Sequence, residues 1–182
     1  KRERLRCGTV RIIGIDPGLA GSGYGVIDEV GGNLQIVEFD EIATSKDSDF
    51  PERLRSIYDD FMRALEEWKP DACAIEALYF AKNAKSAFQV GHARGVFILC
   101  ASLAGLPVYE YTPIQIKKAI VGAGRAEKSQ VQYMIKMILN LEEPPKSEHA
   151  ADALAVAVCH ANSARFRSLT GDPRRVFPGA GR

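Results

Sequence analysis

The stretch that decides the fold of this chain is Val10-Arg11-Ile12-Ile13-Gly14-Ile15-Asp16-Pro17-Gly18. It is an apolar run that ends in an acidic residue and a Pro-Gly turn, which is typical of a buried strand whose last side chain can meet a ligand. Two more strands are expected over 23–30 and 34–44, with glycine-rich connections at 18–23 and 31–33. Three strands joined by short turns predict an antiparallel meander.

After the meander the sequence alternates between helical and strand patterns, which favours parallel β-α-β crossovers. The resulting order βββαβαβααα predicts an α/β fold, a mixed five-stranded sheet flanked by helices on both faces. In chain order, the elements expected after the meander are a helix over 50–68, a strand over 72–77, a helix over 84–104, a strand over 107–112 and helices over 113–121, 127–141 and 147–163.

Four polar side chains occupy positions where a structural protein would place a hydrophobic residue. Asp16 and Glu76 end apolar strands, and His149 and Asp152 lie three residues apart on one face of an Ala/Val-rich helix. An ionised carboxylate in an apolar element is costly unless a positive charge neutralises it, and no Lys or Arg is adjacent to any of the four in sequence. A divalent metal ion is the simplest missing partner, and oxygen ligands of this kind suit Mg²⁺.

Each of these residues also has a structural interpretation. Asp16 could serve the Asp-Pro-Gly turn alone, Glu76 could end an exposed strand, and His149 could be an ordinary residue near a helix start. The pairing of His149 with Asp152 favours function, because an Ala/Val helix packs closely on a sheet and brings the pair near the strand ends. Three carboxylates and an imidazole can hold two metal ions about 4 Å apart for an in-line phosphoryl displacement.

The net charge of +1 hides a segregated distribution. Residues 1–11 carry five Lys or Arg and one acidic residue, and 163–182 carry the same numbers. Positions 28–71 hold thirteen acidic and five basic residues, whereas 82–128 hold seven basic and two acidic residues. A basic segment near a carboxylate cluster is what an enzyme acting on a polyanion needs, since one region holds phosphates and the other holds metal. Chance clustering on a solvated face is the alternative interpretation.

Residues 78–85, Leu-Tyr-Phe-Ala-Lys-Asn-Ala-Lys, place two aromatics beside two lysines in an expected loop. The aromatics can stack on unpaired bases while the lysines hold phosphates, although core packing is the alternative for one of the two aromatics. Lys117, Lys118 and Lys128 are further candidate phosphate contacts, and each could equally be a solvated surface lysine.

A chain of 182 residues predicts one domain, expected over 10–163, with basic, flexible tails at 1–9 and 164–182. No apolar stretch reaches the roughly 20 residues that span a bilayer, and the basic N-terminus leads directly into a strand without a cleavage-like site. The four cysteines form no C-x-x-C pair, which favours buried free thiols and argues against a zinc site. We therefore expect a cytoplasmic protein.

Taken together, these motifs resemble the RuvC family of crossover junction endodeoxyribonucleases, in the family's order over roughly residues 11 to 162. The resemblance rests on Ile13-Gly14-Ile15-Asp16-Pro17-Gly18 with Gly23-Tyr24-Gly25-Val26, Ile75-Glu76 with Ala81-Lys82-Asn83-Ala84, Ala93-Arg94-Gly95, Val121-Gly122 with Ala126-Glu127-Lys128, and His149-Ala150-Ala151-Asp152-Ala153-Leu154-Ala155.

The resemblance implies a ribonuclease-H-like fold, a homodimer, and resolution of four-way (Holliday) DNA junctions by paired symmetric nicks in recombination and repair. It also implies Mg²⁺ as cofactor, with two ions per site and Mn²⁺ as a substitute, and the RuvA and RuvB branch-migration proteins as partners. The family's catalytic, metal-binding positions fall on Asp16, Glu76, His149 and Asp152. Its base-contacting aromatic falls on Tyr79 or Phe80. The full set of candidate DNA-binding residues is Tyr79, Phe80, Lys82, Asn83, Lys85, Arg94, Lys117, Lys118 and Lys128.

The third metal-binding position is Asp in some members of the family and His in others. His149 removes one negative charge from the site and adds a group that titrates near neutral pH. We therefore predict that activity falls below about pH 6, as the imidazole protonates. A flat pH–rate profile through that range, with metal binding intact, would remove His149 from the mechanism.

Two other functions fit part of the pattern. The actin and sugar-kinase type of ATPase also begins with a strand ending in Asp-x-Gly and a three-stranded meander, but it needs two such domains, which 182 residues cannot supply. A catalytically idle junction-binding scaffold of the same fold is the second alternative. The presence of all four ligand residues argues against it.

Overall fold

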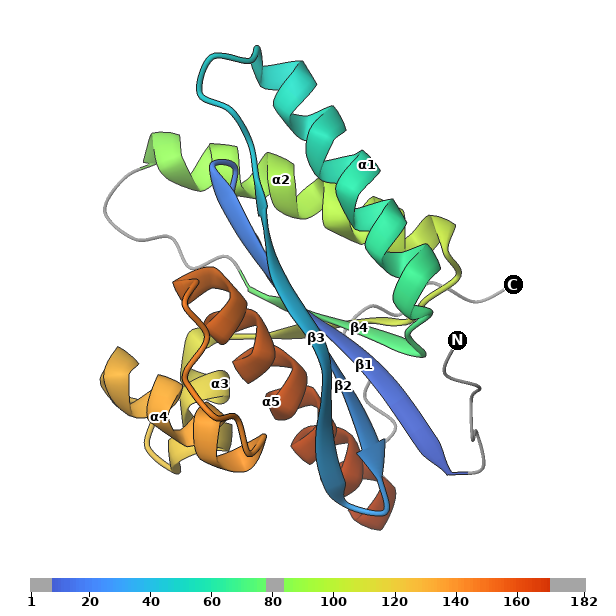
Figure 1. Ribbon diagram of the computed structural model, residues 1–182, viewed down its shortest axis with the longest axis vertical. Coiled ribbons are helices and arrows are strands. Elements are labelled where there is room, and N and C mark those ends of the chain that lie inside the picture. Colours follow the sequence, from blue (N-terminus) through green and yellow to red (C-terminus); the bar gives the residue numbers. More distant parts are fainter. Residues whose placement is uncertain (1–7, 78–83, 171–182) are drawn as a thin grey trace.

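The computed structural model describes residues 8–77 and 84–170 (Figure 1). Within these ranges the predicted order βββαβαβααα is confirmed. The elements are β1 (Thr9–Asp16), β2 (Gly21–Val30), β3 (Asn33–Ala43), α1 (Phe50–Trp68), β4 (Ala72–Glu76), α2 (Ala84–Leu103), β5 (Val108–Tyr111), α3 (Pro113–Val121), α4 (Lys128–Ile138) and α5 (Glu148–Thr170).

The described strands form one mixed sheet in the order β3-β2-β1-β4-β5. The meander is antiparallel, as predicted, whereas β4 runs parallel to β1 and β5 runs parallel to β4. Because parallel neighbours end at the same edge of the sheet, the last residues of β1 and β4 come together.

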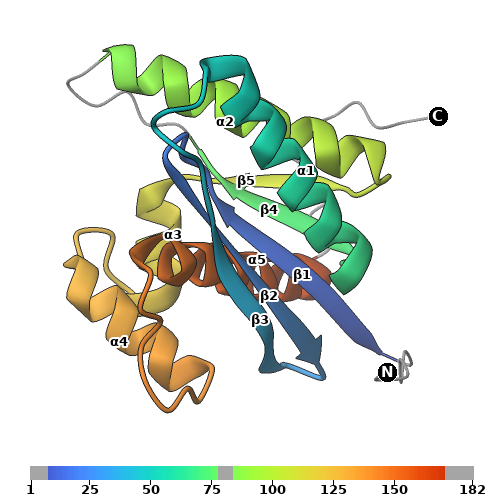
Figure 2. The same ribbon diagram turned by 45° about the horizontal axis from the view of Figure 1, so that its top comes forward.

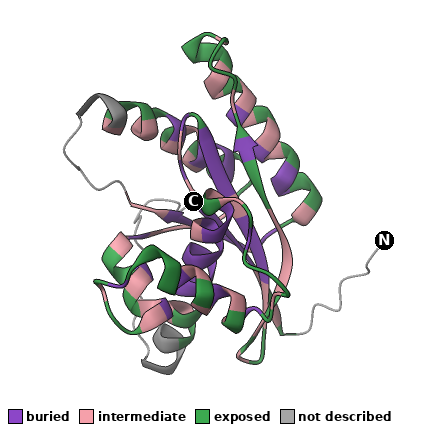
Figure 3. Ribbon diagram, turned by 60° about the vertical axis from the view of Figure 1, so that its left-hand side comes forward, coloured by how far each residue is buried: buried purple, intermediate pink, exposed green. Residues whose placement is uncertain are grey.

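Helices cover both faces of this sheet, as the sequence predicted (Figure 2). One face packs against α1 and α2, where Phe61 and Phe97 meet at 4.8 Å between ring centroids. The other face packs against α5, with α3 and α4 beyond it. Figure 3 shows α5 and the sheet as the buried centre of the molecule. Every residue from Ala150 to Ala161 is buried apart from Asp152.

Glycines on β1 and β2 allow α5 to lie unusually close to the sheet. A Cβ at Gly14 would collide with the backbone of Ala153, and a Cβ at Gly23 would collide with the carbonyl group of His149. The prediction that this Ala/Val helix packs tightly and carries His149 to the strand ends is confirmed. The separation between α5 and the sheet is small because the facing residues are glycines on the strands and mostly alanines on the helix.

We expect Gly23→Ala to lower the free energy of unfolding by about 2 kcal/mol, because α5 must move away from the sheet to admit the methyl group. Urea unfolding measures this change. Gly95→Ala is the matched control, since a Cβ at Gly95 in α2 meets nothing within 4 Å and alanine favours helix by up to about 1 kcal/mol. Equal destabilisation by the two substitutions would contradict the close-packing explanation.

Two helix ends differ from the prediction. α5 continues past the expected end at residue 163 to Thr170, because no Gly or Pro occurs before Gly171. Residues 164–170 are therefore helical and not part of a flexible tail, while 1–7 and 171–182 lie outside the described residues. α4 ends at Ile138, before the expected residue 141, because Asn140 adopts a left-handed conformation with φ of 49°.

Cys73, Cys100 and Cys159 are buried free thiols, as the sequence predicted for the cysteines. Of the helices in the described ranges, none is both long enough and apolar enough to cross a membrane.

Candidate active site

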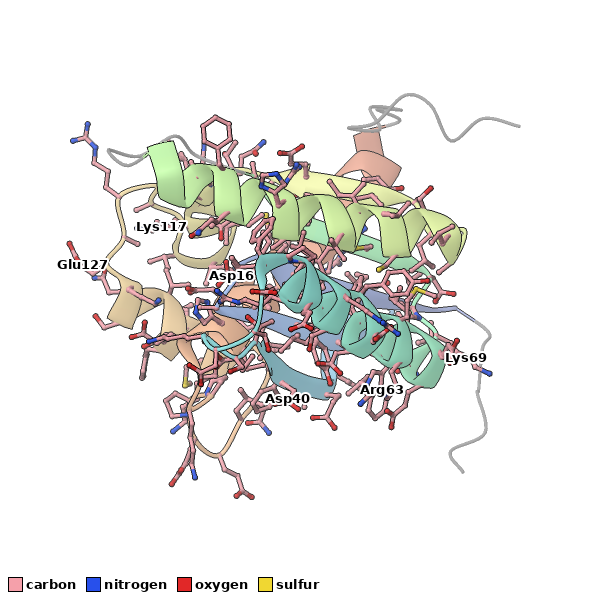
Figure 4. The ribbon with its side chains drawn as sticks, turned by 90° about the horizontal axis from the view of Figure 1, so that it is seen from above. Asp16, Asp40, Arg63, Lys69, Lys117 and Glu127 are labelled. Atoms are coloured by element: carbon pink, nitrogen blue, oxygen red, sulfur yellow. The ribbon has the colours of Figure 1, made fainter. Side chains whose placement is uncertain are left out.

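Asp16 and Glu76 lie side by side at one edge of the sheet. The parallel register pairs Ile15 of β1 with Ile75 of β4, so the two acidic residues that follow end their strands together. The first turn of α5 adds His149, whose Nδ1 lies 2.7 Å from Oδ2 of Asp16. In Figure 4, Asp16 and Lys117 lie on one side of the molecule, away from Arg63 and Lys69 at the end of α1.

Asp152 projects from the next turn of α5 toward α4. Its Oδ2 lies 3.0 Å from Nζ of Lys128, which also lies 3.0 Å from Oε2 of Glu148. Asp152, Glu76, Lys117 and Lys128 line one cavity of about 150 Å³. The absence of a lysine adjacent in sequence was therefore misleading, because the fold brings Lys128 to Asp152 from a different helix.

The acidic side chains disturb one another's ionisation. Burial, followed by the nearby charge of Asp16, raises the pKa of Glu76 to about 8. Burial also raises the pKa of Asp152, although the ion pair with Lys128 opposes that shift. Both causes favour the protonated form of Glu76 in the metal-free protein. A cation at this place would favour loss of that proton.

The hydrogen bond with Asp16 raises the pKa of His149, while burial opposes that change. A proton therefore competes for this imidazole at a higher pH than it would for an ordinary histidine. At limiting metal concentration, we expect the acid limb of the predicted pH–rate profile to lie above the value of about 6 that an isolated imidazole would give.

The donor chemistry fits a divalent ion, since the site offers three carboxylates and an imidazole, and burial together with the charge of Asp16 raises the pKa of one of those carboxylates. As the side chains stand, however, no group of three or more His, Cys, Asp or Glu in the described residues is arranged to hold a metal ion. His149 contacts Asp16 and Lys128 contacts Asp152 instead. The imidazole of His149 and the ammonium group of Lys128 therefore contact the carboxylates of Asp16 and Asp152, which are proposed to bind the ion.

Of the predicted DNA contacts, Lys117 lies at the cavity and Lys118 is exposed on α3. Lys128 also lines the cavity, with its ammonium group bound by carboxylates. Tyr79, Phe80, Lys82 and Asn83 lie outside the described residues, as does the side chain of Lys85.

Arg94 differs from its prediction as a DNA contact. Its side chain is 15% exposed, its guanidinium lies 2.8 Å from Oε1 of Glu110, and its Nε donates to the carbonyl oxygen of Glu76. The buried Nη2 atom is close to Glu110 without hydrogen-bond alignment. Arg94 thus links α2 to β5 and to the end of β4, because a largely buried cation needs an acidic partner inside the protein.

Sequence reasoning missed three polar residues that border the site: Glu41, Ser147 and Glu148. Ser147 is the first residue of the helix predicted over 147–163 and is of a type favoured at the N-cap, so its capping role could have been found. Glu41 and Glu148 carry no such signal, because their contacts with Ser147 and Lys128 join segments that are distant in sequence.

Residues 12–160 match a family model described as "Crossover junction endodeoxyribonuclease RuvC". The chain belongs to the RuvC family. It is 47% identical over 163 residues to a RuvC protein of Ruminiclostridium cellulolyticum, covering 90% of this chain and 98% of that protein. It is 51% identical over 158 residues to the RuvC protein of Alkaliphilus metalliredigens, covering 87% of this chain and 96% of that protein.

Solved structures agree with membership of the RuvC family. The structure titled "T. thermophilus RuvC in complex with Holliday junction substrate" superposes with a TM-score of 0.82 at 37% identity, covering 86% of this chain and 96% of that one. The yeast mitochondrial Holliday junction resolvase Ydc2, with a TM-score of 0.62 at 14% identity over 89% and 83% of the two chains, shares the fold. The predicted ribonuclease-H-like mixed sheet is confirmed by these RuvC and resolvase structures.

Proposed function

We propose that this chain resolves four-way DNA junctions by paired, symmetric, metal-dependent nicks during recombination and repair. One observation carries the proposal: the fold brings Asp16, Glu76, His149 and Asp152 from three distant segments to one end of the sheet. Membership of a family of endodeoxyribonucleases supports it, as does similarity to a RuvC structure titled as a complex with Holliday junction substrate. Acting on DNA, the protein would work in the cytoplasm.

Mg²⁺ is the ion we propose for this site, with Mn²⁺ as an alternative. When bound, two such ions would supply Lewis acidity to the attacking water and neutralise charge on the phosphate. Asp16, His149 and Asp152 would hold the ions, and Glu76 would orient the attacking water after losing its proton. The reaction would hydrolyse a phosphodiester and leave 5′-phosphate and 3′-hydroxyl ends.

An ion at Asp16 would compete with the contact between that carboxylate and Nδ1 of His149. An ion at Asp152 would displace Lys128 from its ion pair. The freed ammonium of Lys128 then lies at the cavity beside Lys117, where both can hold the phosphate to be cut. We further propose that Lys118 contacts phosphates, and that Tyr79 or Phe80 stacks on an unpaired base beside Lys82, Asn83 and Lys85.

Paired symmetric nicks require two active sites related by a two-fold axis, so we propose a homodimer. α2 offers a surface for it, because Phe88, Leu99 and Leu103 are 70%, 54% and 61% exposed. Their spacing of eleven and four residues places them on one face of the helix. Exposed apolar stripes of this kind mark protein–protein contacts. RuvA and RuvB are proposed as further partners from the family resemblance.

The experiment that tests the function compares a synthetic four-way junction with a linear duplex of the same sequence, each with Mg²⁺ or with EDTA. We expect symmetric nicking of the junction in Mg²⁺ and no cutting of the duplex. Tight junction binding without any cleavage would instead establish the idle-scaffold alternative. Cleavage in EDTA would refute the metal dependence.

A further inference from the structure

Three residues form a row across the meander beneath the start of α5. The register pairs Asp16 of β1 with Gly23 of β2, and Gly23 with Glu41 of β3. Residues paired across antiparallel strands share a face, so both carboxylates lie on the face that carries α5, one on each side of the glycine. The absence of a side chain at Gly23 leaves room for the backbone of His149.

The first turn of α5 contacts all three members of this row. The His149 carbonyl group lies over Gly23, and the His149 imidazole contacts Asp16. On the other side, the hydroxyl group of Ser147 donates a hydrogen bond to Oε2 of Glu41. The start of α5 is therefore tied to the sheet at both flanks.

Ser147 is also the residue that caps α5. Its Oγ accepts the N–H of Ala150 at 3.3 Å, and its carbonyl oxygen accepts the N–H of Ala151 at 3.1 Å. Because Glu41 takes the hydroxyl proton, the lone pairs of Oγ face the helix, as the cap requires. Glu41 thus fixes the orientation of the cap one turn before Asp152.

Glu41 and Asp16 lie on strands two apart in the sheet, so about 10 Å separates their backbones. An ion would compete with the contact between Asp16 and His149, but the bond between Glu41 and Ser147 joins no proposed ligand. It can hold the helix start in place during that competition.

We propose that Glu41 is a positioning residue for the metal site, which it serves by holding Ser147 and thereby setting His149 and Asp152 relative to Asp16. This inference rests on the proposed function. It predicts that the hydrogen-bond acceptor at position 41 matters more than the negative charge there.

The test measures binding of Mn²⁺ alone to the full chain by electron paramagnetic resonance at fixed pH. We expect Glu41→Ala to weaken Mn²⁺ binding by about tenfold, the lower end of the losses seen when groups that orient metal ligands are removed. Glu41→Gln keeps an acceptor oxygen and should stay within about twofold of the wild type. Ser147→Ala combined with Glu41→Ala should bind Mn²⁺ no more weakly than Ser147→Ala alone, since the two residues act through one bond.

Glu38→Ala is the matched control, because Glu38 lies on the same strand but its carboxylate accepts the backbone N–H of Phe39. It should leave Mn²⁺ binding unchanged. Unaltered binding in Glu41→Ala, or equal losses in Glu41→Ala and Glu41→Gln, would overturn the positioning role.

A second measurement separates this inference from the proposed function. Without metal, amide hydrogen exchange at Ala150 and Ala151 should accelerate in Glu41→Ala and not in Glu38→Ala. Unchanged exchange would refute the tie between Glu41 and the helix start. A wild-type chain that shows this tie but binds no Mn²⁺ and cuts no junction would refute the proposed function, and with it any role of Glu41 toward a metal.

Discussion

Asp152→Asn should leave junction binding nearly intact and lower the rate of cleavage by at least about a thousandfold. The substitution keeps the shape of the side chain and removes its charge, so α5 should pack as before. A proposed metal ligand that loses its charge forfeits several kcal/mol of transition-state stabilisation, and each 1.4 kcal/mol is about tenfold in rate. Gel-shift binding in EDTA and single-turnover cleavage in Mg²⁺ measure the two properties separately.

The structure supplies a matched control, because Lys128 contacts two carboxylates at the same distance of 3.0 Å. Glu148→Gln removes the other partner of Lys128, which is not a proposed ligand, and should change cleavage by less than about tenfold, as expected for an exposed ion pair. If both variants lost activity equally, the effect would arise through Lys128. Normal cleavage by Asp152→Asn would show that the ligand assignment is wrong.

Glu76→Gln should abolish cleavage to a similar degree and yet stabilise the metal-free protein at alkaline pH. The pKa of Glu76 is raised to about 8 in the folded chain by burial and by Asp16, from an ordinary value of 4.5. Between these values the folded state keeps a proton that the unfolded state has released, so the free energy of unfolding falls as pH rises toward 8 and levels off above it. Glutamine is neutral at every pH and avoids this loss.

Urea unfolding in EDTA at about pH 5 and about pH 9 tests this linkage. We expect the advantage of Glu76→Gln over the wild type to grow by on the order of 2 kcal/mol between the two conditions. Mg²⁺ should reverse the difference at the higher pH, because it binds the ionised wild-type site and stabilises that chain by mass action. A difference that is independent of pH would contradict a pKa of Glu76 raised by burial and by Asp16.

Local signals explain why most of the fold could be predicted. α1 occupies the predicted range because Asp49 and Glu52 form a capping box and Lys69 ends the helix in a left-handed conformation. α3 likewise begins after Thr112 and ends at Gly122, with φ of 79°. Such caps can be predicted because each depends on only four or five consecutive residues. The meander was equally readable, because its turns are short and rich in glycine.

The four proposed ligands could be found for a different reason, namely that each interrupts an apolar element. The partners of the charged side chains could not be found, because they depend on which distant segments the fold brings together. Arg94 contacts Glu110 and Lys128 contacts Asp152, and neither contact was predicted from the sequence. No local pattern encodes such pairs.

The position of α5 in the chain has a consequence for synthesis in the cell. It is the final described element, yet it fills the centre of the molecule and supplies His149 and Asp152. A nascent polypeptide that has emerged only as far as β5 or α4 therefore lacks half of the proposed ligands and the core of one face. If His149 and Asp152 are ligands as proposed, a growing chain would become able to cut DNA only once this last helix has been made.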